Sequence, residues 1–288
     1  MKKNTCAICN DNISFLWKIY SQSTKHNYNI YQCKNCKVRQ INPIPDSKET
    51  RKLYQKEYFQ KRSDRGYNNY ESTAVKKTII RTVEKNLNDL NFYSWEKLMP
   101  DKNKLSLDIG CAAGYFVEYL KNRNWQAEGI DIASQMTNAA KKKQLTIYNA
   151  DFLKKKFPSL KYNLVTLWAS IEHLENPSAF LNKINKILKP NGKLYLSTCH
   201  LGFFARIKKK NWRYLNVPEH IWFFTRKSLK ELAKTNGFSM TTSFTYGSGF
   251  TTKENAGFFY KFLKIIFDSL AKQNHMGDMI VCEFIKNK

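Results

Sequence analysis

The stretch Leu105-Ser-Leu-Asp-Ile-Gly-Cys-Ala-Ala-Gly-Tyr-Phe116 decides the fold of this 288-residue chain. An apolar strand ends there in a turn of small residues, and Glu128-Gly-Ile-Asp131 ends a second strand in a carboxylate. Small residues let the backbone approach a ligand closely. In an open α/β sheet, ligands lie beyond the carboxyl ends of the strands. The pattern therefore predicts a nucleoside site in which the acid accepts hydrogen bonds from a ribose diol.

The spacing of the small residues separates two kinds of nucleotide site. A dinucleotide fingerprint reads G-x-G-x-x-G, whereas this chain reads D-x-G-x-A-x-G from Asp108 to Gly114. The second pattern resembles the first motif of class I S-adenosylmethionine (SAM) methyltransferases, although that family usually has Gly where this chain has Ala112. The resemblance implies SAM as cofactor and a Rossmann-like α/β fold, a seven-stranded sheet with its last strand antiparallel.

Further segments extend the resemblance, in the family's order, as far as Phe238. Residues 149–152 follow a short strand and resemble the segment that contacts the adenine edge. Residues 162–168 resemble the fourth strand, and residues 169–177 the loop that closes over the methionine moiety. Residues 188–197 resemble the turn and fifth strand that nearly every member carries.

The resemblance also assigns cofactor contacts residue by residue. The acid that ends the first strand belongs near the methionine end of SAM, the acid of the second strand at the ribose, and the segment after the third strand at the adenine. The residues expected to bind SAM are Asp108, Gly110, Ala112, Gly114, Asp131, Ile132, Asp151, Phe152 and Trp168.

Four of the seven cysteines form two C-x2-C pairs near the N-terminus. Two such pairs on tight turns can complete a tetrahedral zinc shell, and in a reducing compartment metal binding is favoured over disulfides. Residues 14–20 and 28–32 read as the strands of a ribbon hairpin. Four protein ligands leave no open position, so we expect a structural zinc. The expected ligands are Cys6, Cys9, Cys33 and Cys36.

The chain divides into four predicted segments. A zinc ribbon occupies residues 1–45, ending at Asn42-Pro-Ile-Pro45, because paired prolines stop both helix and ladder. A helical connector occupies residues 46–100 and includes a helix after Asp46 and another over 73–92. The SAM-binding core occupies residues 101–200. Residues 201–288 contain an acceptor-lining segment, a helix and a final hairpin. The ribbon and connector resemble the N-terminal arrangement of bacterial sugar and surface-glycan methyltransferases.

Two Glu-His pairs are candidates for acid–base chemistry. Methyl transfer from a sulfonium is an in-line displacement, and a base is needed only where the acceptor must lose a proton. His220 follows Glu219 among aromatic residues and is the stronger candidate base, with a hydrogen-bonded structural role as the alternative. His173 follows Glu172 after the fourth strand, where loop closure is the alternative.

Position 169 bears on metal catalysis. Some ubiquinone-pathway O-methyltransferases resemble this chain at the fourth-strand loop and carry an additional Glu three residues before the Glu-His pair, which they use for a divalent metal. This chain has Ala169 there. The resemblance therefore disfavours a metal-assisted mechanism at this loop, and with it a catechol-like acceptor.

The formal net charge of +26 raises the question of an anionic partner. Lysine runs at 141–143, 154–156 and 208–210 suit RNA phosphates, but lysines are spread over the whole chain, so compositional bias explains the charge equally well. No apolar region follows the basic N-terminus and no stretch approaches the roughly 20 apolar residues of a spanning helix. We expect a cytoplasmic protein.

Apolar residues recur at helical spacing over 254–273, with lysines around them. Such a helix could lie on an anionic membrane surface, or pack on the core or on a second subunit. Strands are expected over 238–246 and 278–285, the hairpin that ends the sheet.

These observations predict a SAM-dependent methyltransferase. The expected acceptor is a small molecule or a sugar in surface-glycan or secondary metabolism, methylated on oxygen or carbon. An RNA methyltransferase and a non-catalytic zinc-ribbon adaptor on a methyltransferase-like scaffold are the alternatives. The oligomeric state is left open.

Overall fold

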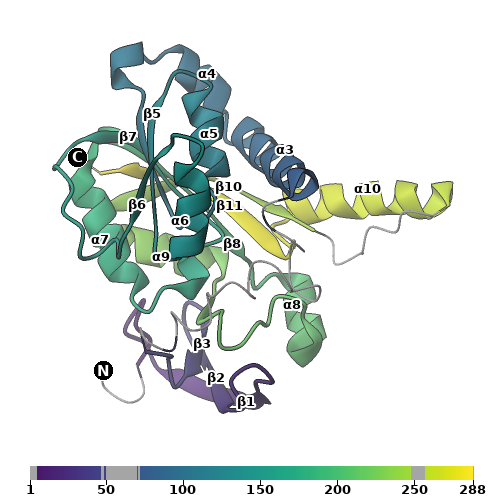
Figure 1. Ribbon diagram of the computed structural model, residues 1–288. Coiled ribbons are helices and arrows are strands. Elements are labelled where there is room, and N and C mark those ends of the chain that lie inside the picture. Colours follow the sequence, from purple (N-terminus) through teal and green to yellow (C-terminus); the bar gives the residue numbers. More distant parts are fainter. Residues whose placement is uncertain (1–4, 47–48, 50–69, 71, 248–256, 288) are drawn as a thin grey trace.

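The computed structural model describes residues 5–46, 49, 70, 72–247 and 257–287. A large sheet with helices on both faces lies above a smaller sheet at the N-terminal end of the chain (Figure 1). The strands of the large sheet are β4 (Leu105–Ile109), β5 (Gln126–Asp131), β6 (Thr146–Asn149), β7 (Tyr162–Trp168), β8 (Leu188–Cys199), β10 (Phe238–Tyr246) and β11 (Met279–Lys286).

The large sheet has the strand order β10-β11-β8-β7-β4-β5-β6. Strand β11 is antiparallel to both of its neighbours, while the pairs from β8 to β6 are parallel. This arrangement confirms the predicted seven-stranded sheet with an antiparallel last strand. The order reverses between β4 and β7, which is where such sheets bind ligands at the carboxyl ends of their strands.

Helices cover both faces of this sheet because successive strand residues point to opposite sides. Leu164 and Tyr195 pack with α3 and α5, whereas Val165 and Leu196 share a cluster with α7 and α9. The helices are α3 (Thr73–Asp89), α4 (Phe92–Lys97), α5 (Tyr115–Lys121), α6 (Ser134–Lys141), α7 (Pro177–Ile187), α8 (Phe203–Lys208), α9 (Arg226–Thr235) and α10 (Phe258–Gln273), with short 3-10 turns η1 (Asp101–Asn103), η2 (Ile171–His173) and η3 (Lys209–Asn211).

Side-chain caps explain where three of the helices begin. The Ser72 hydroxyl accepts from the Val75 amide at 3.2 Å and starts α3, and Asn176 accepts from the Ala179 amide ahead of α7. Thr225 and Ser228 cap α9 reciprocally. The predicted helix over 73–92 is confirmed as α3, which ends three residues earlier.

The small sheet contains a short strand that lies about 180 residues further along the chain than its neighbour β3. Its order is β1 (Ile13–Tyr20), β2 (Asn27–Cys33), β3 (Arg39–Asn42) and β9 (Trp222–Phe223). The hairpin β1–β2 is the predicted one, whereas β9, which pairs antiparallel with β3, is an addition that the sequence does not predict. A two-residue strand is too short to show a sequence period, so only the fold reveals it.

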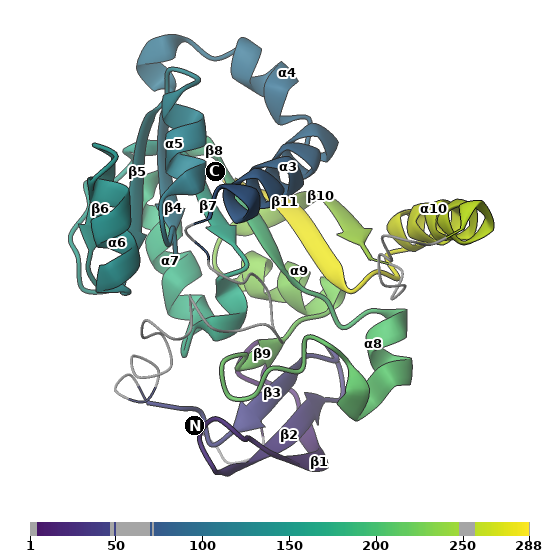
Figure 2. The same cartoon turned by 45° about the vertical axis from the view of Figure 1, so that its right-hand side comes forward.

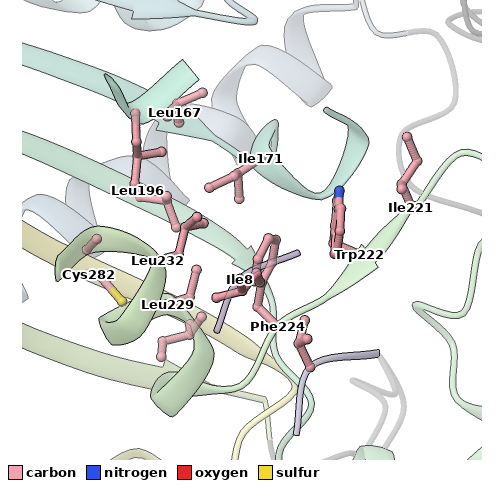
Figure 3. Packing of buried hydrophobic residues seen from close by; sticks show 14 of the residues in the cluster. Ile8, Leu167, Ile171, Leu196, Ile221, Trp222, Phe224, Leu229, Leu232 and Cys282 are labelled. Carbon is pink, nitrogen blue, oxygen red and sulfur yellow. The ribbon is translucent and has the colours of Figure 1, made fainter. Parts of the chain in front are cut away.

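The ribbon and the large domain share one hydrophobic core. Ile8 of the ribbon lies beside Phe224 and near Leu229 and Leu232 of α9 (Figure 3). The same cluster continues through Trp222 into the large sheet. The described part of the ribbon, from residue 5 onward, is therefore packed against the large domain.

The connector between ribbon and core is described only in part. The predicted helix after Asp46 lies mostly outside the described residues. Asp46 and Glu49 do exchange the hydrogen bonds of a capping box, at 2.8 and 3.0 Å.

Helix α10 projects away from the body of the molecule (Figure 2). In the chain, α10 follows β10 and precedes β11. Among the described helices, none combines the length and apolar character needed to cross a bilayer.

Candidate functional site

The turn after β4 brings the backbone close to the switch point of the sheet. Gly110, Ala112 and Gly114 have φ angles of 75°, 44° and 71°, in the left-handed region that favours glycine. A Cβ on Gly110 would lie 2.4 Å from Ser170 Oγ. The turn therefore needs a residue without a side chain at this position.

Asp131 is held at the end of β5 by two backbone amides. The Ala112 amide donates to Oδ2 at 2.9 Å, and the Ala133 amide donates to Oδ1 at 2.8 Å. Burial raises the pKa of Asp131, and these backbone hydrogen bonds act in the opposite direction. Each carboxylate oxygen can accept more than one hydrogen bond, so the oriented carboxylate can still accept from a diol.

A cavity of about 770 Å³ opens above these residues. It runs from Asp131 and Asp151 past Trp168 to Tyr246 and Met279. The predicted SAM-binding residues that line it are Gly110, Ala112, Asp131, Ile132, Asp151, Phe152 and Trp168.

The other two predicted SAM-binding residues are not among those lining the cavity. Gly114 is buried at the start of α5, where its positive φ shapes the turn. Asp108 lies below the cavity, 5% exposed, and accepts a hydrogen bond from Thr166 Oγ1 at 2.6 Å. Burial raises the pKa of Asp108 to about 7. This acid ties β4 to β7 beneath the site.

The chemistry of the cavity wall fits SAM. Carboxylates at Asp131 and Asp151 suit the hydroxyl and amino groups of an adenosine. The indole Nε1 of Trp168 is buried and has no hydrogen-bond partner among the described residues. Together with the side-chain-free turn at Gly110, these groups form a concave site with a few placed polar contacts, as small-molecule sites have.

The structure brings the two predicted histidines together. Their rings meet edge to face, with centroids 4.8 Å apart. His173 Nδ1 lies 2.7 Å from the Glu219 carbonyl oxygen, and His220 Nδ1 lies 2.9 Å from that of Tyr214. A carbonyl only accepts, so each Nδ1 carries a hydrogen and each neutral ring has its basic lone pair on Nε2.

The two histidines differ in their access to the cavity. His173 lines it, whereas His220 is 8% exposed and is not among the lining residues. Glu172 is buried beside them and accepts from Thr198 Oγ1 at 2.8 Å. The pairing of the two Glu-His motifs could not be read from the sequence, because it depends on how the segment containing β9 folds back.

Glu172, His173 and His220 also form a group with the residue types of a metal site. Their ligand atoms lie within 4.8 Å of one another. The resemblance to ubiquinone-pathway O-methyltransferases disfavours a metal here, because Ala169 stands where some of them carry an acid. In the fold, His220 supplies a third potential ligand from a different segment, so the local sequence does not describe the full donor set.

The four N-terminal cysteines converge as predicted. Their sulfur atoms lie within 4.8 Å of one another, with Cys6 to Cys36 at 3.7 Å and Cys9 to Cys33 at 3.4 Å. A tetrahedron with Zn–S bonds of about 2.3 Å has sulfur atoms about 3.8 Å apart, whereas a disulfide needs about 2.05 Å. The spacing fits a metal site with four thiolate ligands.

Helix α3 contributes a cavity wall that the sequence did not predict. Val83 and Asn86 lie on it, and Asn86 is only 7% exposed. A polar residue within the buried stripe of an amphipathic helix was the available signal. The lining residues of α3 are Ile79, Thr82, Val83, Lys85 and Asn86.

The chain is also similar to known proteins in sequence. Its residues 79–243 match the family model described as "Methyltransferase domain". The ubiquinone biosynthesis O-methyltransferase of Coxiella burnetii is 26% identical over 176 residues, covering 58% of this chain and 72% of that protein. The enzyme of the same name from Idiomarina loihiensis is 30% identical over 141 residues, covering 44% and 58%.

Solved structures agree at the level of the fold. A SAM-dependent methyltransferase from Archaeoglobus fulgidus superposes with a TM-score of 0.51 at 16% identity, covering 72% of this chain and 94% of that chain. The family model covers more than half of the 288 residues, and the large sheet has the seven strands and antiparallel last strand that the resemblance predicts. The chain therefore belongs to the methyltransferase-domain family and is a class I SAM-dependent methyltransferase.

Proposed function

We propose that this enzyme transfers the methyl group of SAM to an oxygen or carbon of a small-molecule or sugar acceptor, in surface-glycan or secondary metabolism. The observation that carries the proposal is the single cavity that reaches from Asp131 to Tyr246 and Met279. Its length leaves an acceptor compartment beyond Trp168. A concave compartment of this kind suits a small acceptor.

The residues at the SAM end would orient the cofactor. Asp131, fixed by the amides of Ala112 and Ala133, would accept from the ribose hydroxyls. Asp151 and Phe152 would bind the adenine edge and face. The bound cofactor supplies an electrophilic methyl group, so the protein's main task is to hold the acceptor in line with it.

The acceptor compartment is mostly apolar with a few polar groups. Met279 and Val281 of the last strand form one wall, and Asn86 of α3 faces the cavity with Ser197. Tyr246 donates to Asp89 Oδ2 at 2.5 Å, which fixes its ring. Such a surface suits an acceptor with an apolar face and a small number of hydroxyl groups.

We assign proton acceptance to His173 and a positioning role to His220. Support comes from the place of His173 on the cavity wall and from the Glu219 carbonyl, which directs its basic Nε2 away from that backbone contact. His220 packs against the His173 ring and is itself held by the Tyr214 carbonyl. A base within reach of the acceptor accelerates transfer by roughly 10²–10⁴-fold where deprotonation is required.

We also propose that the four-cysteine cluster holds a structural zinc ion. The support is the sulfur spacing and the burial of three of the four cysteines. The Ile8 amide points at Cys6 Sγ at 3.4 Å, a backbone contact that stabilises a thiolate. No position is left for substrate, so the metal's role is to hold the ribbon together.

Calorimetric titration with SAM and S-adenosylhomocysteine tests the proposal. We expect binding by the wild type and a loss of at least about tenfold in affinity for Asp131→Ala, because a charge-assisted hydrogen bond is removed. Asp101→Ala, at an exposed carboxylate outside the cavity, is the matched control and should bind normally. An acceptor screen with labelled SAM, beginning with nucleotide sugars, follows. Failure of the folded, zinc-loaded protein to bind either ligand would favour the adaptor.

A further inference from the structure

Helix α10 exposes an apolar surface that the rest of the described chain does not cover. Seven of its large apolar side chains are between 39% and 86% exposed, Leu263 is half-buried, and Ala271 is its only buried residue. The exposed residues are Phe258, Phe259, Phe262, Ile265, Ile266, Phe267 and Leu270. The C-terminal end of the helix packs on the described core through Ala271, whereas its remaining apolar surface projects from the body of the molecule (Figures 1 and 2).

The helix is amphipathic, and the side opposite its apolar surface is basic. At 100° per residue, Phe259, Ile266 and Leu270 centre the apolar side. Lys261, Lys264 and Lys272 lie on the other side, with Asp268 paired to Lys264. Basic polar faces opposite aromatic and aliphatic residues are typical of helices that lie in the interface of an anionic membrane.

We propose that α10 docks this enzyme on an anionic membrane surface. Charge complementarity selects this occupant over a second copy of the chain. Each chain has a formal net charge of +26, so two copies repel each other, whereas anionic lipid attracts juxtamembrane lysines. Exposed Phe203 and Ile207 on α8, followed by Lys208 at its end, add a similar combination near α10 (Figure 2).

The base of α10 is rigidly connected to the catalytic domain. Thr245 Oγ1 donates to the Ala271 carbonyl at 2.7 Å, and Lys272 contacts Asp89 of α3 at 2.7 Å. Tyr246 and Met279, the residues that end β10 and begin β11 on either side of the helix, line the cavity. Docking through α10 therefore brings the acceptor compartment beside the membrane, and this position favours a membrane-bound acceptor. The inference of a membrane-bound acceptor rests on the proposed transfer reaction, whereas the inference of docking does not.

Vesicle flotation of the whole 288-residue chain tests the docking. We expect co-flotation with phosphatidylcholine vesicles containing phosphatidylglycerol, little with phosphatidylcholine alone, and weaker binding at high salt. Phe258→Ser/Phe259→Ser/Phe262→Ser should reduce the bound fraction at least about tenfold. The matched control, Phe15→Ser/Leu98→Ser/Leu160→Ser, alters exposed apolar residues elsewhere and should bind as the wild type does.

A second readout uses Phe259→Trp, which places an indole on the apolar side of α10. Its emission should shift to shorter wavelength with anionic vesicles and be quenched by brominated lipid. Absent flotation, or equal flotation by the α10 triple variant, would overturn the proposal. So would a dimer that the triple variant dissociates without any vesicle binding. SAM titration of the triple variant should match the wild type, so a failure of docking is distinguishable from a failure of the transferase assignment.

Discussion

At the scale of single residues, backbone carbonyls determine what the two histidines can do. The Glu219 and Tyr214 carbonyls fix Nδ1 of His173 and His220 as donors. This leaves Nε2 as the basic atom of each ring. Only His173 also lines the cavity, so the histidine that reaches the cavity is the one that the sequence ranked second.

Replacing these histidines separates the two roles. With the acceptor identified by the screen, we expect His173→Ala to lower kcat by roughly a hundredfold or more. His220→Ala should lower kcat by about tenfold, because His173 loses the ring contact that positions it. SAM affinity, measured by calorimetry, should stay unchanged in both variants. Wild-type turnover in both variants would remove the pair from the mechanism.

Asp108 makes stability depend on pH. Burial raises its folded-state pKa from 3.8 to about 7, so ionising it costs more in the folded than in the unfolded chain. The stabilising contribution of the protonated form is present at low pH and is lost as pH rises from about 4 to about 7. Over this range the free energy of unfolding falls by an amount on the order of 4 kcal/mol at most.

Asp108→Asn should therefore be more stable than the wild type at about pH 8, and this advantage should shrink towards pH 4. The amide oxygen can still accept from Thr166. Urea unfolding at several pH values measures the difference. A difference that stays constant with pH would show that the carboxyl does not titrate in this way.

At the scale of elements, the turn between β4 and α5 has the strictest steric requirement in the site. Gly110 combines a positive φ with a neighbouring Ser170 hydroxyl that a Cβ would meet at 2.4 Å. The loop bearing Ser170 also leads into η2, which contains Glu172 and His173. A change at one glycine would therefore displace both the SAM turn and the histidine loop.

Gly110→Ala should weaken SAM binding by about tenfold or more and lower the melting temperature, because the clash and the left-handed φ both oppose a side chain. Gly257→Ala is the matched control, because no described atom lies within 4 Å of its Cβ position and its φ is −60°. Calorimetry and thermal unfolding compare the two. Equal SAM affinity in both variants would contradict the steric argument.

At the scale of the whole molecule, hydrogen bonds connect the ribbon to the cavity. Thr225 Oγ1 donates to the Cys36 carbonyl at 2.7 Å, and β3 pairs with β9. Next to β9, the Ile221 amide donates to the Glu172 carbonyl and the Trp222 indole to the Leu174 carbonyl, each at 2.8 Å. The segment that completes the ribbon sheet thus also holds the loop with His173.

Loss of the proposed zinc ion from the ribbon should therefore affect the distant site. We expect Cys36→Ser to lose zinc, to melt on the order of 10 °C lower, and to bind SAM more weakly. Lys34 is exposed between Cys33 and Cys36, and Lys34→Ala should keep the zinc ion, the melting temperature and the SAM affinity of the wild type. Elemental analysis of the wild type should find one zinc ion per chain. If it finds a second metal ion per chain, and His220→Ala loses that ion, the second ion is assigned to Glu172, His173 and His220. Full stability and SAM binding without zinc would refute the coupling.

The sequence by itself determined the features that depend on local spacing. Residues 162–168, which resemble the family's fourth strand, and residues 238–246, predicted as a strand of the final hairpin, are β7 and β10 with the predicted bounds. Strand period and burial are local properties of the sequence. The small-residue turn, the end of β5, and the segments after β6 and at the end of β7 that resemble the family together predicted seven of the residues that line the cavity. The two C-x2-C pairs predicted a four-sulfur cluster before any fold was known.

Only the tertiary structure decided how remote segments meet. It placed His220 behind His173, added β9 to the ribbon sheet, and made α3 a wall of the cavity. It also left the apolar side of α10 exposed, where the sequence allowed core, subunit or membrane. The physical reason is that periodicity tells which face of an element is apolar, whereas the contacts between elements fix what that face meets.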